Sequence, residues 1–255
     1  MQDKNLAYLI KNMPASINNA NLIITISEFT KKRILYHYPK LDPKSIIVAH
    51  IPPVDQEIKH PSLNDRLLNL GITSKKYILY LGTIEPRKNI SNLVDAYAQL
   101  SPEVKSEYSL VLAGGAGWKN EAIMQKINNY KSDGLNIILT GYVSDQEKSM
   151  LYSNALMFIL PSHYEGFGMP ILEAMQYHTP VAASDIEIFH EVAESAVEYF
   201  DKDDPVDIAN SISNIIDNPT LRSDMILNGN ELLKKYNWKD ISQIVYEGLQ
   251  KINRQ

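Results

Sequence analysis

The sequence predicts an α/β protein built on a doubly wound parallel sheet. Short, continuously apolar runs recur from residue 77 onward, as expected for strands that are buried on both faces. Helical patterns lie between these runs, so strand and helix alternate in the manner of βαβ units. The runs are YILYLG (77–82), SLVLAG (109–114), NIILTG (136–141), ALMFILP (155–161), PVAAS (180–184) and the weaker VEYF (197–200).

The helix that follows the first of these runs illustrates the pattern. Its apolar side chains recur with a period near 3.6 residues, which predicts one buried face. They are Ile90, Leu93, Val94, Tyr97 and Leu100. Asn89 stands directly before this stretch and is predicted to cap the helix with its side chain.

The first 60 residues depart from this alternation. NLIITIS (21–27) predicts one more buried strand and EFTKKRILYHYP (28–39) a following helix, but one strand and one helix cannot bury both faces of a sheet. Three prolines and scattered charges in IPPVDQEIKHPSLND (51–65) indicate a linker. We therefore predict the last piece of another domain at residues 1–50, a linker at 51–75, the α/β domain at 76–235 and a C-terminal helix at 236–255.

Composition excludes several classes of protein. The 255 residues are 44% hydrophobic, which suffices for a core, and the net charge of −5 gives no general attraction to nucleic acid. The absence of cysteine excludes a disulfide scaffold and a thiolate metal site. The apolar run Ala155 to Leu160 is too short to span a bilayer, and the N-terminus lacks a signal-peptide pattern. We predict a cytoplasmic protein, in solution or peripheral at the inner membrane face.

The loops after the predicted strands are candidates for ligand binding, because ligands of parallel sheets bind beyond the carboxyl ends of the strands. In the first loop, Arg87 and Lys88 precede a helix N-terminus, where the helix dipole disfavours each cation by about 0.3–1 kcal/mol. Such a pair is explained if an anion lies between the cations and the helix. The alternative is a solvated pair that Glu85 neutralises, and the sequence leaves both interpretations open.

The loop EGFGMPILEAM (165–175) places a carboxylate on each side of a glycine-rich turn. Pro170 suits the first position of a helix, and the flanking glycines permit positive φ and close backbone approach. Glu173 falls in the predicted first helical turn, where a carboxylate is favoured in any case, and Glu165 precedes the turn. The turn also offers free N–H groups at a helix N-terminus, which is a second place for an anion besides the loop of Arg87 and Lys88. Two anion-binding places and two carboxylates able to bind hydroxyl groups together predict a nucleotide sugar as the ligand.

The segment EGFGMPILEA, preceded by PSHY, resembles the E-x7-E motif of the retaining family 4 (group 1) glycosyltransferases of GT-B fold. The similarity extends over nearly the whole chain from about residue 20 and implies a Rossmann-like donor-binding domain. Further segments follow the order and spacing of the family: 25–50, LGTIEPRKNI (81–90), AGGAGW (113–118), TGYVSDQE (140–147) and PVAASDIEIFHEVA (180–193).

The resemblance assigns roles to individual residues. It implies that Glu165 binds hydroxyls of the donor sugar, that Arg87 and Lys88 bind the diphosphate, and that these three form the catalytic set. Glu173 would bind the ribose. The remaining implied donor contacts are Tyr142 and Val143 beside the nucleobase, the backbone of Gly166, Phe167, Gly168 and Met169 against sugar and phosphate, and Thr83 and Gly114. Thr83 stands where many members carry arginine.

The resemblance also implies a reaction. We expect a retaining glycosyltransferase, or its donor-binding half, that passes a sugar from a nucleotide-diphosphate donor to a glycan or lipid-linked glycan. The loop GTIEPRKN resembles that of mannosyltransferases, which favours GDP-mannose; no cofactor and no metal are expected. Most of the family's acceptor domain is missing, so we expect either a fragment or a chain that self-associates or uses a partner chain. The alternatives are a non-catalytic nucleotide-sugar-binding subunit and a nucleotide-sugar epimerase.

A second carboxylate motif has a structural alternative. Asp201 and Asp203 match the D-x-D pattern that binds metal in another glycosyltransferase fold. Asp204 and Pro205, however, form an N-cap and first residue ahead of a helical pattern, which favours a structural role for the whole stretch. His163, in the segment PSHY before the E-x7-E motif, either caps a hydrogen bond or meets the donor.

Overall fold

The computed structural model describes residues 2–53 and 60–252. The chain divides into two compact units, one of Met1–Pro52 with Tyr236–Gln255 and one of Pro53–Lys235. Three parts of the predicted segments lie outside the described residues, namely residue 1, residues 54–59 of the predicted linker and residues 253–255 of the predicted C-terminal helix.

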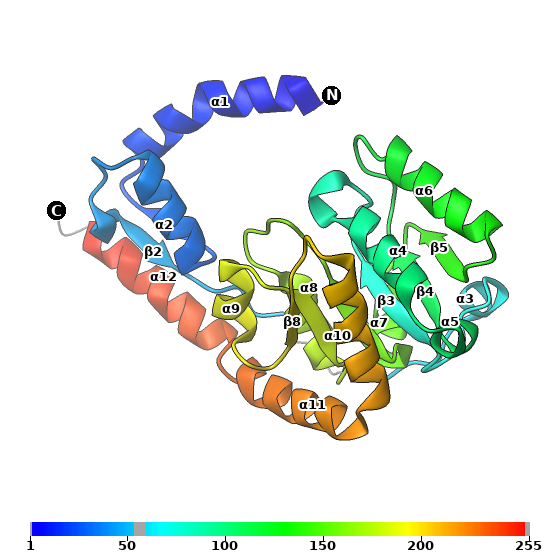
Figure 1. The fold of residues 1–255 in the computed structure, drawn as a ribbon. Helices are drawn as coiled ribbons and strands as arrows, with labels where there is room; N and C mark the ends of the chain where they lie inside the picture. Colours follow the sequence, from blue (N-terminus) through cyan, green and yellow to red (C-terminus); the bar gives the residue numbers. More distant parts are fainter. Residues whose placement is uncertain (1, 54–59, 253–255) are drawn as a thin grey trace. The chain divides into compact units, whose positions relative to one another are not determined.

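The larger unit is built on a six-stranded, wholly parallel sheet, which confirms the predicted α/β class. The strands are β3 (Tyr77–Leu81), β4 (Ser109–Ala113), β5 (Ile137–Gly141), β6 (Met157–Leu160), β7 (Val181–Ser184) and β8 (Glu198–Phe200). Their spatial order is β5-β4-β3-β6-β7-β8 (Figure 1). The chain therefore adds strands outward from β3 in one direction and then reverses, which places a topological switch point between β3 and β6.

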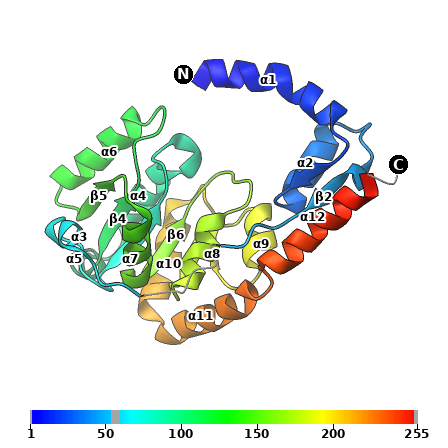
Figure 2. The same cartoon turned by 180° about the vertical axis from the view of Figure 1, so that it is seen from behind.

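Helices cover both faces of this sheet, as Figures 1 and 2 show from opposite sides. On one face α4 (Ile90–Gln99) packs against α6 (Glu121–Ser132) and α10 (Pro205–Asp217). On the other, α8 (Met169–Gln176) packs against α7 (Asp145–Asn154), α9 (Glu187–Ala193) and α11 (Pro219–Leu233). The shorter elements are α3 (Asp65–Asn69), α5 (Pro102–Glu107) and the 3₁₀ turn η2 (Pro86–Lys88). α3 falls within the segment predicted to be a linker.

Strand β3 shows how the core accommodates tyrosine. Tyr77 and Tyr80 are fully buried, yet both hydroxyls have acceptors. Tyr77 donates to the carbonyl of Leu151 at 2.6 Å and Tyr80 to that of Thr83 at 3.0 Å. Because each buried hydroxyl is hydrogen-bonded, the rings contribute apolar area to the core without the cost of an unsatisfied polar group.

Three predicted details of helix starts are wrong. Asn89 does not cap α4, because its backbone is left-handed with φ of 57° and its side chain donates to the carbonyl of Lys202 at 2.7 Å. Helix α8 begins at Met169, so Pro170 is its second residue rather than its first. Glu173 consequently lies beyond the first turn, and proximity to the helix N-terminus does not explain it.

The smaller unit pairs two short strands, β1 (Ile23–Thr25) and β2 (Ile46–Val48), in parallel. It also contains α1 (Gln2–Asn19), α2 (Glu28–His37), the 3₁₀ turn η1 (Pro43–Ser45) and α12 (Trp238–Ile252). Helix α12 packs on β2, and a Cβ added at Gly248 would lie 2.8 Å from the Ile47 side chain. On the same helix Ile244 and Leu249 are 40% and 49% exposed. β2 is not among the strands that the apolar runs predict.

No helix in the described ranges, 2–53 and 60–252, is both long enough and apolar enough to cross a membrane.

Candidate active site

The carboxyl edge of the sheet at the β3–β6 switch point brings two predicted loops into direct contact. The loop 82–89 follows β3 and the loop 161–168 follows β6, and these strands are neighbours. The backbone N–H of His163 donates to the carbonyl of Arg87 at 2.9 Å, which joins the loops through their main chains. Open parallel sheets bind ligands at such a switch point, so the topology alone makes this the first candidate site.

Glu165 is the centre of the contacts between these loops. Its Oε2 pairs with Nη1 of Arg87 at 2.8 Å and its Oε1 with Nζ of Lys88 at 2.5 Å. The Ser162 hydroxyl donates to the same Oε1 at 2.7 Å. The Glu165 and Lys88 side chains are only 12% and 13% exposed, so this is a largely buried pair. The three residues predicted to form the catalytic set therefore lie together.

Glu85 completes a cluster of four charges. Its Oε1 accepts from Nη2 of Arg87 at 2.9 Å, and its side chain is 14% exposed. Two cations and two carboxylates leave the cluster without net charge. The two cations thus have two carboxylate partners, Glu165 and the Glu85 that the alternative interpretation names.

The charges of this cluster keep Glu165 ionised. Burial by itself raises the pKa of the Glu165 carboxyl, but the charge and hydrogen bond of Lys88, the Ser162 hydroxyl and the charge of Arg87 outweigh it, and the pKa is lowered. For Arg87 the effects have the opposite sign: burial lowers the pKa of the guanidinium, but the charges and hydrogen bonds of Glu165 and Glu85 outweigh burial, and the pKa is raised. At neutral pH Glu165 is therefore a hydrogen-bond acceptor suited to hydroxyl groups, and it has no proton to donate.

Glu173 has a different set of partners, both from α7. Lys148 donates to its Oε1 at 2.9 Å and the Tyr152 hydroxyl to its Oε2 at 3.1 Å. The Glu173 side chain is 18% exposed. Burial lowers the pKa of Lys148, but its hydrogen bond with Glu173 and the charge of Glu173 raise the pKa overall. Neither partner was predicted, because both are more than twenty residues distant in the sequence and no local pattern marks them.

The glycine-rich turn between the two glutamates is only partly as predicted. Gly168 has φ of 105°, and a Cβ there would lie 2.8 Å from the Phe189 ring, so this position requires glycine. Gly166 lacks positive φ and a Cβ there would meet no atom within 4 Å, so the freedom that glycine permits is not used at this position. Phe167 is buried, which directs its side chain away from solvent, and Met169 is half-buried at the start of α8.

The loops after β3 and β4 also lie against each other. Ile84 donates its N–H to the carbonyl of Gly115 at 3.0 Å, and the N–H of Gly117 donates back to Ile84 at 2.9 Å. Gly114 has φ of 142°, and a Cβ there would lie 2.1 Å from the carbonyl oxygen of Gly82. The exposed Thr83 follows Gly82 directly. Thr83 thus belongs to the loop that carries Arg87 and Lys88, and Gly114 adjoins that loop.

Tyr142 and Val143 follow β5, which the sheet order places two strands from β3 at the same carboxyl edge. The Tyr142 side chain is 83% exposed and that of Val143 is half-buried. No hydrogen bond or ion pair joins Tyr142 or Val143 to Glu165, Arg87 or Lys88 among the described residues. A ligand would have to extend along the edge to reach both places.

The D-x-D stretch is occupied by structural contacts. Asp201 accepts from the N–H of Asp203 at 2.9 Å, and Asp203 pairs with Lys202 at 2.6 Å. Nδ1 of His163 lies 3.5 Å from Oδ1 of Asp203. Asp204 caps α10 by accepting from Val206 at 2.8 Å, as its position before Pro205 predicts. Over residues 2–53 and 60–252 no group of three or more His, Asp or Glu side chains is arranged to hold a metal ion.

Residues 69–232 match the family described as glycosyl transferases group 1. The chain belongs to this family. An O-antigen chain mannosyltransferase B of Escherichia coli is 32% identical over 246 residues, which cover 91% of this chain and 61% of the relative. The O-antigen chain mannosyltransferase RfbU of Salmonella typhimurium is 33% identical over 55% of this chain and 47% of its own length. This group 1 member therefore spans less than two thirds of the relatives it matches.

Solved structures agree with the assignment at the level of the fold. The HepE protein of Anabaena, solved with UDP and glucose, matches with a TM-score of 0.77 at 18% identity over 94% of this chain and 67% of its own. A sucrose-phosphate synthase of Thermosynechococcus elongatus matches with a TM-score of 0.73 at 24% identity over 92% of this chain and 59% of its own. The fold of this chain is accordingly GT-B, as the sequence predicts.

Proposed function

We propose that the larger unit binds a nucleotide-diphosphate sugar across the β3–β6 switch point, and that the chain is the donor-binding part of a retaining glycosyltransferase. The observation that carries this proposal is Glu165, held as a carboxylate between Arg87 and Lys88 at the edge where parallel sheets bind ligands. Two cations suited to phosphate and a carboxylate suited to hydroxyl groups lie at one point, which supports binding of the junction between diphosphate and sugar.

Binding of the donor then involves an exchange of partners. Arg87 and Lys88 turn from Glu165 to the diphosphate, where arginine offers a bidentate fork and lysine a point charge. Glu165 is left to accept hydrogen bonds from sugar hydroxyls. When the nucleoside diphosphate departs, the two cations offset the charge that develops on it, without a metal ion.

Glu173 and Tyr142 serve the nucleoside in this proposal. Glu173 binds the ribose, and its partners Lys148 and Tyr152 hold its carboxylate in place. Tyr142 and Val143 lie beside the nucleobase, and Thr83, Gly114 and the backbone of 166–169 complete the donor contacts. Glu165 serves the sugar hydroxyls, and the other carboxylate of the cluster, Glu85, is paired with Arg87. Because no carboxylate among the described residues of the switch point is thus an obvious covalent nucleophile, we favour front-face retention, in which the departing phosphate helps deprotonate the acceptor.

The names of the curated relatives favour mannose as the sugar. Both are called mannosyltransferases of O-antigen chains, and the loop of residues 82–89 resembles that class. We therefore propose GDP-mannose as the donor and a glycan or lipid-linked glycan as the acceptor.

Titration calorimetry of the 255-residue chain tests the donor site directly. We expect GDP and GDP-mannose to bind, and Lys88→Ala or Arg87→Ala to weaken GDP binding by about 1.5–3 kcal/mol, the range for hydrogen bonds to charged groups. EDTA should leave binding intact. Binding is the appropriate measurement, because the chain spans only 61% of the E. coli relative.

A matched control uses the opposite end of the same strand. Lys76 precedes β3 and forms an exposed ion pair with Glu107, so Lys76→Ala removes a comparable charge at the amino edge of the sheet. This variant should bind GDP as the wild type does. Equal loss from Lys76→Ala and Lys88→Ala would indicate a nonspecific charge effect and contradict the proposed site. A strict requirement for Mn²⁺ would contradict the metal-free diphosphate contact.

A further inference from the structure

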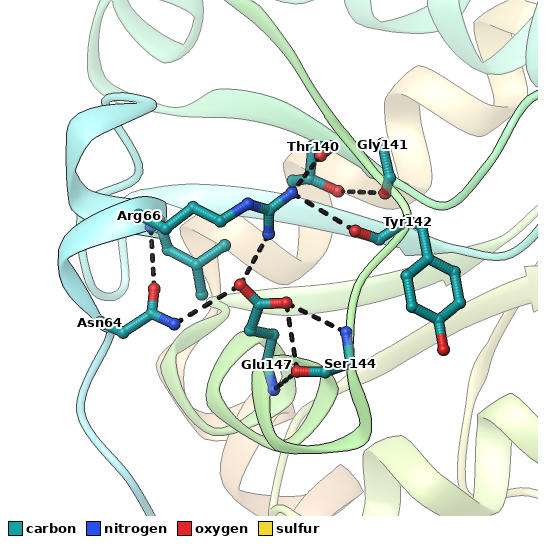
Figure 3. Close-up of polar contacts among 8 residues, drawn as sticks. Asn64, Arg66, Thr140, Gly141, Tyr142, Ser144 and Glu147 are labelled. Atoms are coloured by element: carbon teal, nitrogen blue, oxygen red, sulfur yellow. Dashed lines mark hydrogen bonds and ion pairs between the residues drawn. The ribbon is translucent and has the colours of Figure 1, made fainter.

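A second polar cluster lies at the β5 end of the same sheet edge. We call it the Arg66 clamp and define it as the side chains of Asn64, Arg66 and Glu147 with the main-chain carbonyls of Thr140 and Tyr142 (Figure 3). Asn64 and Arg66 precede residue 69, so they lie outside the part of the chain that matches the family.

Arg66 binds main-chain carbonyls on both sides of Gly141, the last residue of β5. Its Nη2 donates to the carbonyl of Thr140 at 2.5 Å and to that of Tyr142 at 3.3 Å. Its Nη1 donates to Oε1 of Glu147 at 2.7 Å. Because one planar guanidinium satisfies all three acceptors, the backbone that leads into Tyr142 is fixed relative to α7.

Both ends of the clamp are themselves anchored. Glu147 forms a capping box with Ser144, accepting from its N–H at 3.0 Å while the Ser144 hydroxyl accepts from the N–H of Glu147 at 3.2 Å. Asn64 caps α3 by accepting from Leu67, a fully buried residue, and also donates to Glu147. The hydrogen bond from the Ser144 backbone and those from Arg66 and Asn64 outweigh burial and lower the pKa of Glu147 to about 2.

The Arg66 clamp fixes the main chain of Tyr142. Tyr142 is 83% exposed, and Figure 3 shows its ring pointing away from the Arg66 guanidinium. An exposed aromatic side chain on a fixed backbone is suited to stacking on a nucleobase, because less conformational freedom is lost when the base binds.

We infer that Arg66 is a positioning residue for nucleobase binding, which fixes the main chain on either side of Gly141 so that Tyr142 is presented to the base. This inference rests on the proposed nucleotide-sugar function. It assigns a role to a side chain that does not itself contact the ligand and that lies outside the family match.

A double-mutant cycle tests the inference on the full 255-residue chain, with GDP and UDP as probes in titration calorimetry. We expect Tyr142→Ala to weaken binding of the preferred diphosphate about tenfold, a typical loss for one base–aromatic stack. Arg66→Ala should weaken it about fivefold, corresponding to the ordering of one side chain. The double variant should bind no more weakly than Tyr142→Ala alone, because the clamp acts through that ring.

Two further variants separate positioning from stability. Arg66→Lys keeps a cation for Glu147 but cannot reach both carbonyls with a planar fork, so it should retain thermal stability and still show the fivefold loss. Arg222→Ala is the matched control, because it removes a guanidinium that donates to the carbonyls of Ile215 and Ile216 at 2.6 Å, at the end of α10. It should leave the affinity for GDP and UDP unchanged.

The outcomes distinguish this inference from the function on which it rests. If the wild type binds neither GDP nor UDP, the proposed function and the inference both fail. If the wild type binds but Arg66→Lys has wild-type affinity, only the inference fails. Losses from Arg66→Ala and Tyr142→Ala that add in full in the double variant also overturn it, because a purely structural effect of Arg66 would be independent of the ring.

Discussion

The two halves of the carboxyl edge are held together in different ways. At the switch point, the loops after β3 and β6 share one main-chain hydrogen bond, from His163 to Arg87, and their charged side chains meet in ion pairs, with Glu165 between Arg87 and Lys88. At the β4–β5 half, the contacts involve the main chain: Gly114 lies against the Gly82 carbonyl, and Arg66 binds the carbonyls beside Gly141.

This difference separates exchangeable contacts from fixed ones. A side-chain ion pair can break and form again with a ligand, because both charges can find new partners. A close backbone approach or a guanidinium on main-chain carbonyls has no such alternative and holds the loop in one conformation. The switch-point half is therefore suited to binding charged groups, and the β4–β5 half to fixing the shape of the edge.

Gly114→Ala should have the largest effect, on the fixed half. A Cβ would lie 2.1 Å from the Gly82 carbonyl oxygen, and φ is 142°, so the backbone has to shift and we expect a loss of about 3 kcal/mol in the free energy of unfolding. Gly115→Ala is the matched control one residue later, because a Cβ there meets no atom within 4 Å. Urea unfolding compares them, and equal stability of the two variants would show that the edge is not fixed at Gly114.

The exchangeable half predicts a division of labour between the two glutamates. Glu165→Ala should weaken GDP-mannose binding by about 1.5–3 kcal/mol and leave GDP bound at least as tightly as in the wild type, because it frees Arg87 and Lys88 for the phosphates. Glu173→Ala should weaken GDP, UDP and GDP-mannose alike, since its proposed partner is the ribose. Calorimetry with all three ligands decides this, and the same ligand dependence in both variants would disprove the division.

The smallest effect concerns acid stability of the Arg66 clamp. The folded pKa of Glu147 is about 2, below its usual 4.5, so its stabilising contribution is complete above about pH 4.5 and is lost as the pH falls toward 2. Between about pH 5 and about pH 3 the wild type should lose about 1 kcal/mol more unfolding free energy than Glu147→Gln, a modest figure because Arg66 is half exposed to solvent. Urea unfolding at the two pH values measures it, and parallel losses would contradict the assignment.

The strands of the larger unit could be predicted from the sequence because each is a continuous apolar run between glycine-containing turns. The grouping of Glu165, Arg87 and Lys88 could be predicted as well, since loops after neighbouring parallel strands share one edge. The S-x-x-E spacing of Ser144 and Glu147 is a capping-box signature that local reading could also have found.

Other features depend on contacts that leave no trace in local sequence. The partners of Glu173 come from a neighbouring helix, and Arg66 reaches its acceptors from a segment that reads as linker. Asn89 is diverted from capping by the carbonyl of Lys202, more than one hundred residues away. Strand β2 is three residues long and follows a 3₁₀ turn, too short for a hydrophobic period to be recognised.

The balance of two cations and two carboxylates at the switch point has a consequence for selectivity in a phosphate-rich environment. A bare anion that approaches Arg87 and Lys88 must displace Glu165 and leave that largely buried carboxylate without compensation. A ligand that carries hydroxyl groups beside its phosphates offers the displaced carboxylate new donors at the same moment. If the proposed function holds, the site therefore favours ligands that carry phosphate and sugar together and discriminates against inorganic phosphate, which supplies only one of the two.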